Sequence, residues 1–182
     1  MKFAHIADVH LGTRKDSPYL YEGFLNFIDY IELHPVDMIF ITGDLFDHPP
    51  TKEEILWVDT ELARLVKTDI LYVTGNRDYL GQDSVLWKYD FVSRMYLLDC
   101  DEIHNHVPEN ERATRNSYAE GILDSLHFPK YDMDVYGICQ YGPYNERNDF
   151  DSVYARNLHK INIFLGHGGS TKVCPFDVDD FG

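Results

Sequence analysis

The stretch VDMIFITGD, residues 36–44, is a short apolar run that ends in a glycine followed by an aspartate. An apolar run of this length is typical of a strand that is buried on both faces of a parallel sheet. Residues 70–74 have the same character and end in Gly75-Asn76. The sequence therefore predicts two buried parallel strands, each followed by a polar side chain just beyond its carboxyl end.

Helices are predicted on both sides of the first of these runs. Apolar residues recur at three- and four-residue steps over residues 20–33, and Pro35 ends that pattern. Thr51 and Glu54 have the spacing of a capping box, which predicts the start of a second helix. Together with a first strand over residues 2–8, these helices give two strand–helix–strand crossovers, which are typical of a mostly parallel α/β sheet.

The second half of the chain is less regular, and no domain boundary is visible in it. We interpret all 182 residues as one domain, which is an ordinary size for a single core. The elements expected here are a polar loop or short hairpins over 99–117, strand pairs over 118–128, a strand over 134–138, a short helix over 151–158 and a strand over 161–165.

The composition excludes some classes of protein. The chain has 31 acidic and 16 basic side chains, a formal charge of −15, which argues against an extended surface for DNA or anionic lipid. It does not exclude a metal site, where carboxylates gather around cations. No run of 18 apolar residues occurs, so we expect no membrane association. Three widely spaced cysteines without zinc or redox spacing predict a reducing, cytoplasmic setting.

Polar side chains that can bind metals follow four of the expected strands. Because the carboxyl ends of the strands form the site in α/β sheets, we expect these side chains to converge. Carboxylate, imidazole and amide oxygen together suit divalent ions such as Mn, Fe or Zn. A carboxylate shared by two ions sets them about 4 Å apart, a spacing used in phosphoryl chemistry. The candidate ligands are Asp8, His10, Asp44, Asn76 and His167.

At these residues the chain resembles the calcineurin-like metallophosphoesterases. That family is marked by Asp-x-His, Gly-Asp, Gly-Asn-His-Asp/Glu, a later His and a final Gly-His-x-His. The matching stretches here are DVHLG at 8–12, GDLFD at 43–47, GNRD at 75–78 and GHGG at 166–169. The first two are most similar to the SbcD-type DNA repair nucleases, and the resemblance runs from residue 2 to about residue 169.

The resemblance implies both a fold and a mechanism. The implied fold is α/β, a metallophosphoesterase-like layered sheet core with flanking helices in an α/β/β/α sandwich. Asp8 and His10 would hold a first divalent ion, Asp44 would bridge two ions, and Asn76 and His167 would hold the second. The expected ions are manganese, with iron or zinc as alternatives. Water between them would attack phosphorus in DNA or another phosphodiester, as in an SbcD-type exonuclease or endonuclease.

Two residues beside the ligands are assigned to catalysis rather than to metal binding. Arg77 stands where the family has a histidine that can protonate the leaving oxygen. Arginine cannot usefully donate a proton, although it can stabilise phosphate charge with a bidentate contact. Because general acid catalysis contributes about 10²–10⁴-fold, we expect a slow enzyme, a good leaving group or a different donor. Asp78 matches the family pattern and is expected to orient the neighbouring loop.

The final Gly-His-x-His is absent, and His167 is the last histidine of the chain. We therefore expect a phosphoesterase domain that is incomplete at its C-terminus and lacks its last metal-binding segment. His104 and His106 have the spacing of the missing pair, but they lie in a polar stretch without a Gly-His strand end. We interpret them as ordinary loop residues. If the analogy holds, an ATPase partner resembling SbcC would bind through segments outside this chain.

Two other functions are open at this point. The acidic charge favours a phosphatase or nucleotidase for a small phosphoester, since such a substrate needs no basic track. Arg77 and the missing ligands favour a binding module that keeps the fold without the chemistry. Tyrosine is also a residue type that stacks on bases, although 13 tyrosines in one domain are more typical of half-buried surfaces. The tyrosines considered for stacking are Tyr19, Tyr21, Tyr141 and Tyr144.

Overall fold

Two four-stranded sheets form the centre of the molecule, and a computed structural model describes them in residues 1–12, 17–98, 100, 102–117, 123, 125–144 and 155–168. Sheet 1 is wholly parallel, in the order β1 (Phe3–Ile6), β2 (Met38–Thr42), β3 (Asp69–Val73) and β4 (Met95–Leu97). Sheet 2 has the order β5 (Thr114–Asn116), β6 (Ser125–Phe128), β7 (Met133–Gly137) and β8 (Ile161–Leu165). In sheet 2, only the β7–β8 pair is parallel.

The apolar runs noted in the sequence form the middle of sheet 1. Every residue of β2 and β3 is buried, because each strand has a neighbour on both sides and is covered on both faces. Strand β1 lies at the edge and alternates between exposed and half-buried residues. The prediction of a parallel α/β sheet is confirmed.

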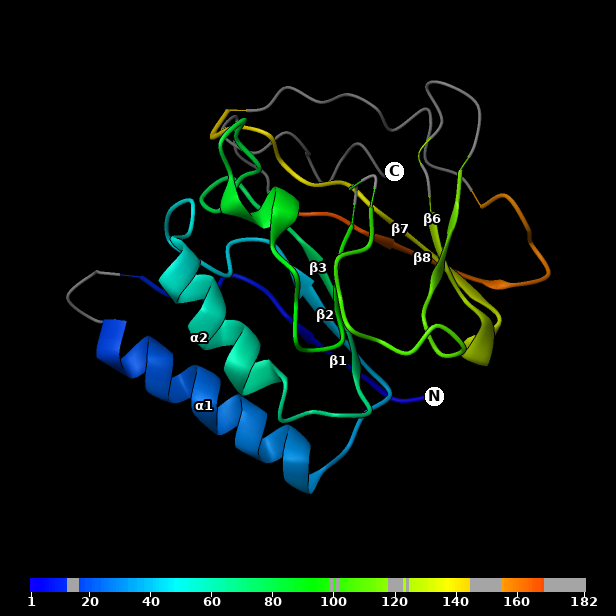
Figure 1. Cartoon of the computed structure of the whole chain (residues 1–182), viewed down its shortest axis with the longest axis horizontal. Coiled ribbons are helices and arrows are strands. Elements are labelled where there is room, and N and C mark those ends of the chain that lie inside the picture. Colours follow the sequence, from blue (N-terminus) through cyan, green and yellow to red (C-terminus); the bar gives the residue numbers. More distant parts are fainter. Residues whose placement is uncertain are drawn as a thin grey trace.

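Helices α1 (Ser17–Leu33) and α2 (Lys52–Leu62) lie together on one face of sheet 1 (Figure 1). Each buries a stripe of apolar side chains at helical spacing, as the sequence predicts. The capping box at the start of α2 is present, since Thr51 and Glu54 bond reciprocally to each other's backbone N–H. Both crossovers therefore return the chain to the same end of sheet 1, where the next strand begins.

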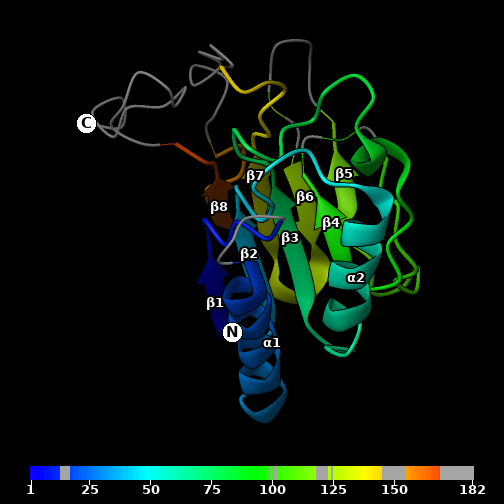
Figure 2. The same cartoon turned by 90° about the vertical axis from the view of Figure 1, so that its left-hand side faces the viewer.

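Sheet 2 packs against the other face of sheet 1 (Figure 2). The rings of Tyr96 and Phe128 meet edge to face across the interface, with centroids 5.2 Å apart. The thiol of Cys139, just after β7, donates to the carbonyl oxygen of Leu98 at 3.1 Å. The two sheets thus share one core, and the described layers are helix, sheet, sheet. Both described α-helices cover sheet 1, so the second helical layer of the expected sandwich is not among the described residues.

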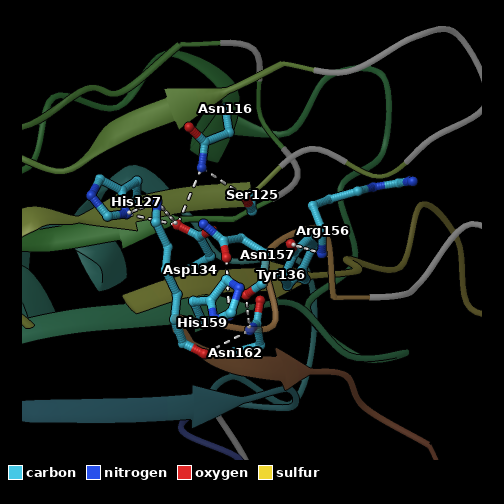
Figure 3. A network of polar contacts seen from close by, with 10 residues as sticks. Asn116, Ser125, His127, Asp134, Tyr136, Arg156, Asn157, His159 and Asn162 are labelled. Atoms are coloured by element: carbon cyan, nitrogen blue, oxygen red, sulfur yellow. Dashed lines mark hydrogen bonds and ion pairs between the residues drawn. The ribbon is translucent and has the colours of Figure 1, made fainter. Parts of the chain in front are cut away.

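A polar network around Asp134 links the start of β8 to the neighbouring strands of sheet 2 (Figure 3). Asp134 on β7 is 2% exposed, and its Oδ1 accepts hydrogen bonds from His127 at 2.7 Å and from Asn116 at 3.3 Å. The ammonium of Lys160 lies 3.4 Å from the same oxygen. Because Lys160 directly precedes β8, this buried carboxylate holds the start of the strand whose far end carries His167.

Some boundaries differ from the sequence prediction. Helix α1 begins at Ser17 rather than at residue 20, because Pro18 is tolerated in a first turn where its missing N–H loses no bond. Strand β4 was not predicted, because three residues give no measurable alternation. Residues 155–158 are irregular, with a bend and the start of a turn, rather than the end of a helix, and 151–154 lie outside the described residues. The remaining short elements are the 3₁₀ turns η1 (Val85–Lys88) and η2 (Pro129–Tyr131).

None of the described helices combines the length and the apolar character that a membrane span requires.

Candidate metal centre

The loops that follow β1 and β2 run side by side at the carboxyl end of sheet 1. The N–H of Asp8 donates to the carbonyl oxygen of Gly43 at 3.2 Å, and the N–H of His10 donates to that of Asp44 at 2.9 Å. Leu11 continues the pairing, donating to Leu45 at 2.9 Å. This pairing brings Asp8, His10 and Asp44 together, although more than 30 residues separate the two loops.

Three candidate ligands have a left-handed backbone. The φ angles are 53° at Asp8, 55° at His10 and 51° at Asp44. Residues other than glycine rarely adopt this backbone conformation, which costs of order 1 kcal/mol or more per residue. Such strain is found most often at functional sites. Among the described residues that are not glycine, only Asp132 also has a positive φ, so the strain is concentrated at this site.

The side chains of these loops meet His167, which follows β8. Oxygen and nitrogen atoms of Asp8, Asp44 and His167 all lie within 4.8 Å of one another. The Oδ2 atom of Asp44 is 3.7 Å from Nε2 of His167 and 4.0 Å from Nε2 of His10. Nε2 of His10 is also 3.7 Å from Oδ1 of Asp8. These separations are longer than hydrogen bonds.

The donor set fits divalent ions. Ligand atoms about 2.0–2.2 Å from one ion lie roughly 3 to 4 Å from each other, close to the separations observed here. Asp44 is central, because the same carboxylate oxygen faces both imidazoles. The structure therefore places a candidate metal site at the carboxyl ends of β1, β2 and β8, as the strand-end argument predicts.

His167 is held in the tautomer that a metal ligand requires. Its Nδ1 lies 2.9 Å from the carbonyl oxygen of Thr42, and a carbonyl oxygen can only accept, so Nδ1 carries the proton. In the neutral imidazole, Nε2 is then the nitrogen that offers a lone pair, and it faces Asp44. Gln140 also donates from Nε2 to the carbonyl oxygen of His167 at 3.2 Å. Such outer contacts fix the orientation of metal-binding histidines.

Two glycines make room for this approach. Gly43 has φ 80°, and a Cβ there would overlap the imidazole of His167. A Cβ on Gly75 would overlap the carboxylate of Asp44. Both positions therefore need glycine so that side chains from β2 and β8 can lie against the backbone.

Asp78 is the buried anchor of the site. Its side chain is fully buried and accepts hydrogen bonds from the N–H groups of Gly75 at 2.6 Å and Leu45 at 2.7 Å. Further bonds come from the N–H groups of Asp44 and Phe46 and from the Tyr72 hydroxyl. Burial raises the pKa of Asp78, although the bonds from Tyr72 and Gly75 act against this. One carboxylate therefore holds the turn after β2 to the turn after β3, which is a positioning role.

Arg77 and Asn76 lie on the turn after β3. The backbone N–H of Arg77 donates to Oδ1 of Asp44 at 2.9 Å, and the Arg77 side chain is exposed. Asn76 is half-buried and lies between Gly75 and Arg77, both of which meet Asp44. The contacts thus bring together four of the five candidate ligands directly, and Asn76 through its two neighbours.

The histidines set aside in the sequence lie in other contacts. His104 is 3.4 Å from Glu102, and His106 is 3.1 Å from Asp90. The sequence reasoning missed Thr42, Gln140 and Tyr72, which orient His167 and Asp78. Thr42 acts through its own carbonyl oxygen, and Gln140 acts on the carbonyl oxygen of His167. No pattern of residue types signals such contacts with the backbone. Tyr72 gave no signal either, because it reads as one more apolar residue of a buried strand.

Comparisons with known proteins identify a family and several relatives. The family model of calcineurin-like phosphoesterases matches residues 1–182. The DNA double-strand break repair protein Mre11 of Methanopyrus kandleri is 28% identical over 139 residues, which cover 72% of this chain and 30% of that protein. Mre11 of Sulfurisphaera tokodaii is 39% identical over 83 residues, covering 41% of this chain and 21% of that protein.

A second kind of relative is also similar. The UDP-2,3-diacylglucosamine hydrolase of Shewanella halifaxensis is 31% identical over 93 residues, which cover 44% of this chain and 34% of that enzyme. The chain thus spans about a third or less of the curated relatives that it matches. The family match over the whole length, together with the α/β fold and the cluster at its strand ends, shows that this chain belongs to the calcineurin-like phosphoesterase family.

Proposed function

We propose that this chain hydrolyses phosphodiester bonds in DNA with the help of two divalent metal ions. The observation that carries the proposal is the position of Asp44, whose Oδ2 faces His10 at 4.0 Å and His167 at 3.7 Å. A carboxylate between two imidazoles is suited to bridge two ions. Asp8 and His10 would complete one ion site, and Asn76 and His167 the other. The ions that we propose are manganese, with iron or zinc as alternatives.

The ions would supply an activated water and neutralise charge on the phosphate. The protein supplies the positions. Asp78 holds the turns after β2 and β3, which carry Asp44 and Asn76, so both turns are in place before substrate arrives. The exposed Arg77 can approach a phosphate oxygen with a bidentate contact, but it cannot protonate the leaving oxygen. We therefore expect substrates with good leaving groups to react faster.

DNA is the substrate supported by the two Mre11 relatives. The charge of −15 sets a limit on how this chain alone would hold DNA, because duplex binding relies on Lys and Arg. We propose that other segments, or an ATPase partner resembling SbcC, provide most of the DNA affinity.

The test is hydrolysis of bis-(p-nitrophenyl) phosphate and of single-stranded DNA with added manganese. Turnover above a metal-only blank is expected, and Asp44→Asn should abolish it while leaving the protein folded. His104→Ala is the matched control, since His104 lies outside the cluster. Absence of turnover by a protein shown to hold two ions would refute the proposal.

Arg77→His tests whether the chemistry has been weakened at this position. A histidine could supply the missing proton, so kcat on a poor leaving group should rise by about 10²-fold or more. Little change on p-nitrophenyl esters is expected, because that leaving group needs no proton. Full activity with Arg77 on both kinds of substrate would show that the arginine is no defect.

A second candidate is a phosphatase or nucleotidase that acts on a small phosphoester. The similarity to UDP-2,3-diacylglucosamine hydrolase favours it, as does the acidic charge. A higher kcat/KM for monoesters or nucleotides than for DNA and bis-(p-nitrophenyl) phosphate would select this function.

A further inference from the structure

Two aromatic side chains are stacked at the same end of the sheets as the candidate metal centre. The rings of Trp87 and Tyr141 are within 10° of parallel, with centroids 5.9 Å apart. Trp87 belongs to η1, in the segment after β3, and Tyr141 follows β7. Figure 1 shows these green and yellow segments side by side beyond the carboxyl ends of the strands.

Trp87 is a rigid support for Tyr141. Its indole Nε1 donates to the carbonyl oxygen of Gly81 at 2.9 Å, and its ring packs against the main core. These contacts fix the plane of the indole, and the Tyr141 ring lies parallel to it. Tyr141 is nevertheless 36% exposed, so this ring is both oriented and accessible.

The stack is linked to the metal centre by short contacts. Gln140, directly before Tyr141, donates from Nε2 to the carbonyl oxygen of His167 at 3.2 Å. Its own carbonyl oxygen accepts from the N–H of Leu80 at 2.7 Å. Leu80 is three residues beyond Arg77, whose N–H bonds to Asp44. The stack therefore lies one residue in sequence from a contact with the backbone of His167.

We propose that Tyr141, supported by Trp87, is a platform on which a nucleobase of the substrate stacks beside the reacting phosphate. The proposal rests on the proposed function and adds a specificity-determining residue to it. Stacking on an aromatic ring needs no positive charge and accepts any base. It therefore suits a chain with a charge of −15, which has few cations with which to hold a phosphate backbone.

Tyr21, which was also considered for stacking, differs from Tyr141 in its surroundings. Tyr21 meets Trp57 edge to face at 4.8 Å, which is the geometry of core packing rather than of a platform. Tyr30 offers a matched control, because it is also exposed and stacked, with its ring 4.2 Å from that of His34. It lies near the end of α1, at the opposite end of the sheets from the metal centre (Figure 2).

Fluorescence can test the platform without catalysis. The chain has two tryptophans, so Trp57→Phe leaves Trp87 as the only reporter. With EDTA present to stop hydrolysis, oligo(dT) should change the Trp87 emission, whereas an abasic oligonucleotide of the same length should bind more weakly. Tyr141→Ala should raise the dissociation constant for oligo(dT) by roughly 5- to 150-fold. Tyr141→Phe and Tyr30→Ala should leave it within about twofold of the parent.

The outcomes separate this inference from the proposed function. Equal binding of oligo(dT) and the abasic strand, or no effect of Tyr141→Ala, overturns the platform even if DNA is hydrolysed. If binding depends on bases and on Tyr141 but manganese gives no hydrolysis, the platform stands and the proposed function fails. A KM for oligo(dT) that rises in Tyr141→Ala but not in the control Tyr30→Ala, in a protein that hydrolyses DNA with manganese, supports both.

Discussion

The two sheets contribute to the candidate metal centre in different ways. Sheet 1 provides four of the five candidate ligands, on loops that are bonded to each other and to the buried Asp78. Sheet 2 provides only His167, held by the carbonyl oxygen of Thr42 and by Gln140. The first part of the site is thus built by the local fold of one sheet. The second depends on how the two sheets pack, and the following predictions separate the two.

The largest effect is expected at the anchor in sheet 1. Asp78→Ala leaves several buried N–H groups without an acceptor, and each unsatisfied group costs about 1–3 kcal/mol. We expect the free energy of unfolding to fall by about 3–4 kcal/mol in urea titrations. The control is Asp83→Ala, an exposed carboxylate five residues away, with a change within about 0.5 kcal/mol. Equal effects of the two substitutions would contradict the anchoring role.

The next largest effect is the stabilisation of the protein by metal, which is expected to depend on both sheets. Manganese at 100 times its dissociation constant should stabilise the folded protein by about 2.7 kcal/mol, read as a rise in Tm. His167→Ala should remove much of this gain, measured against the Tm of the same variant without metal, because the cluster then loses its imidazole from sheet 2. His104→Ala should keep the full gain. If His167→Ala keeps it as well, sheet 2 contributes nothing to metal binding.

A smaller effect is expected from the strained backbone of sheet 1. Asp8→Gly relieves a left-handed conformation and removes a carboxylate that faces Asp44, so metal-free stability should rise by about 1 kcal/mol. Asp8→Asn removes only the charge, and its stability should fall between the two. Neither variant should gain stability from manganese as the parent does. His167 has no such backbone strain, so His167→Gly should show no comparable rise.

The smallest effect concerns His48, which links the loop after β2 to the start of α2. Burial alone would lower the pKa of His48, but hydrogen bonds and charge from Asp47 and Glu54 outweigh this and raise it. The folded state therefore binds the proton more tightly than the unfolded state. The stabilisation is complete below the ordinary pKa of 6.5 and is lost as pH rises through the raised value.

Replacing His48 should remove this pH dependence. His48 is partly exposed, so solvent screens its interaction with Asp47 and Glu54. We therefore expect the stability difference between the parent and His48→Asn to shrink by about 0.5 kcal/mol between about pH 6 and pH 8. Thermal unfolding across this range measures it. A difference that grows with pH would mean that the two carboxylates do not hold the imidazolium.

The sequence predicted sheet 1 well because its signals are local. Continuous apolar runs, a capping box and the glycines before Asp44 and Asn76 predicted β2, β3, α2 and the position of Asp44. Sheet 2 was predicted unevenly: β7 and β8 were expected within one residue of their observed bounds, whereas β5 and β6 were not distinguished individually, because such short strands give little alternation. Strand β5 has three residues, and its partner β6 was visible only as an unspecified strand pair.

The site shows the same division. Residue types at strand ends predicted which side chains converge. Atoms of Asp8, Asp44 and His167 lie within 4.8 Å of one another, and their binding of metal stays a prediction. What holds them could not be predicted, because it lies in backbone atoms and in rotamers. The left-handed angles at Asp8 and His10 leave no mark in composition, and the bond from His167 to Thr42 involves a carbonyl that every residue possesses.

That last bond also sets an order of events during folding. Thr42 and His167 are 125 residues apart, so their contact closes one of the longest loops in the described structure. Contacts of large sequence separation form late, since the entropy of closing the loop must first be overcome. During synthesis, Asp8, His10 and Asp44 leave the ribosome long before β8 is available. Metal binding that requires His167 would therefore report that both sheets have formed and packed, and the loops of sheet 1 alone would not complete this centre.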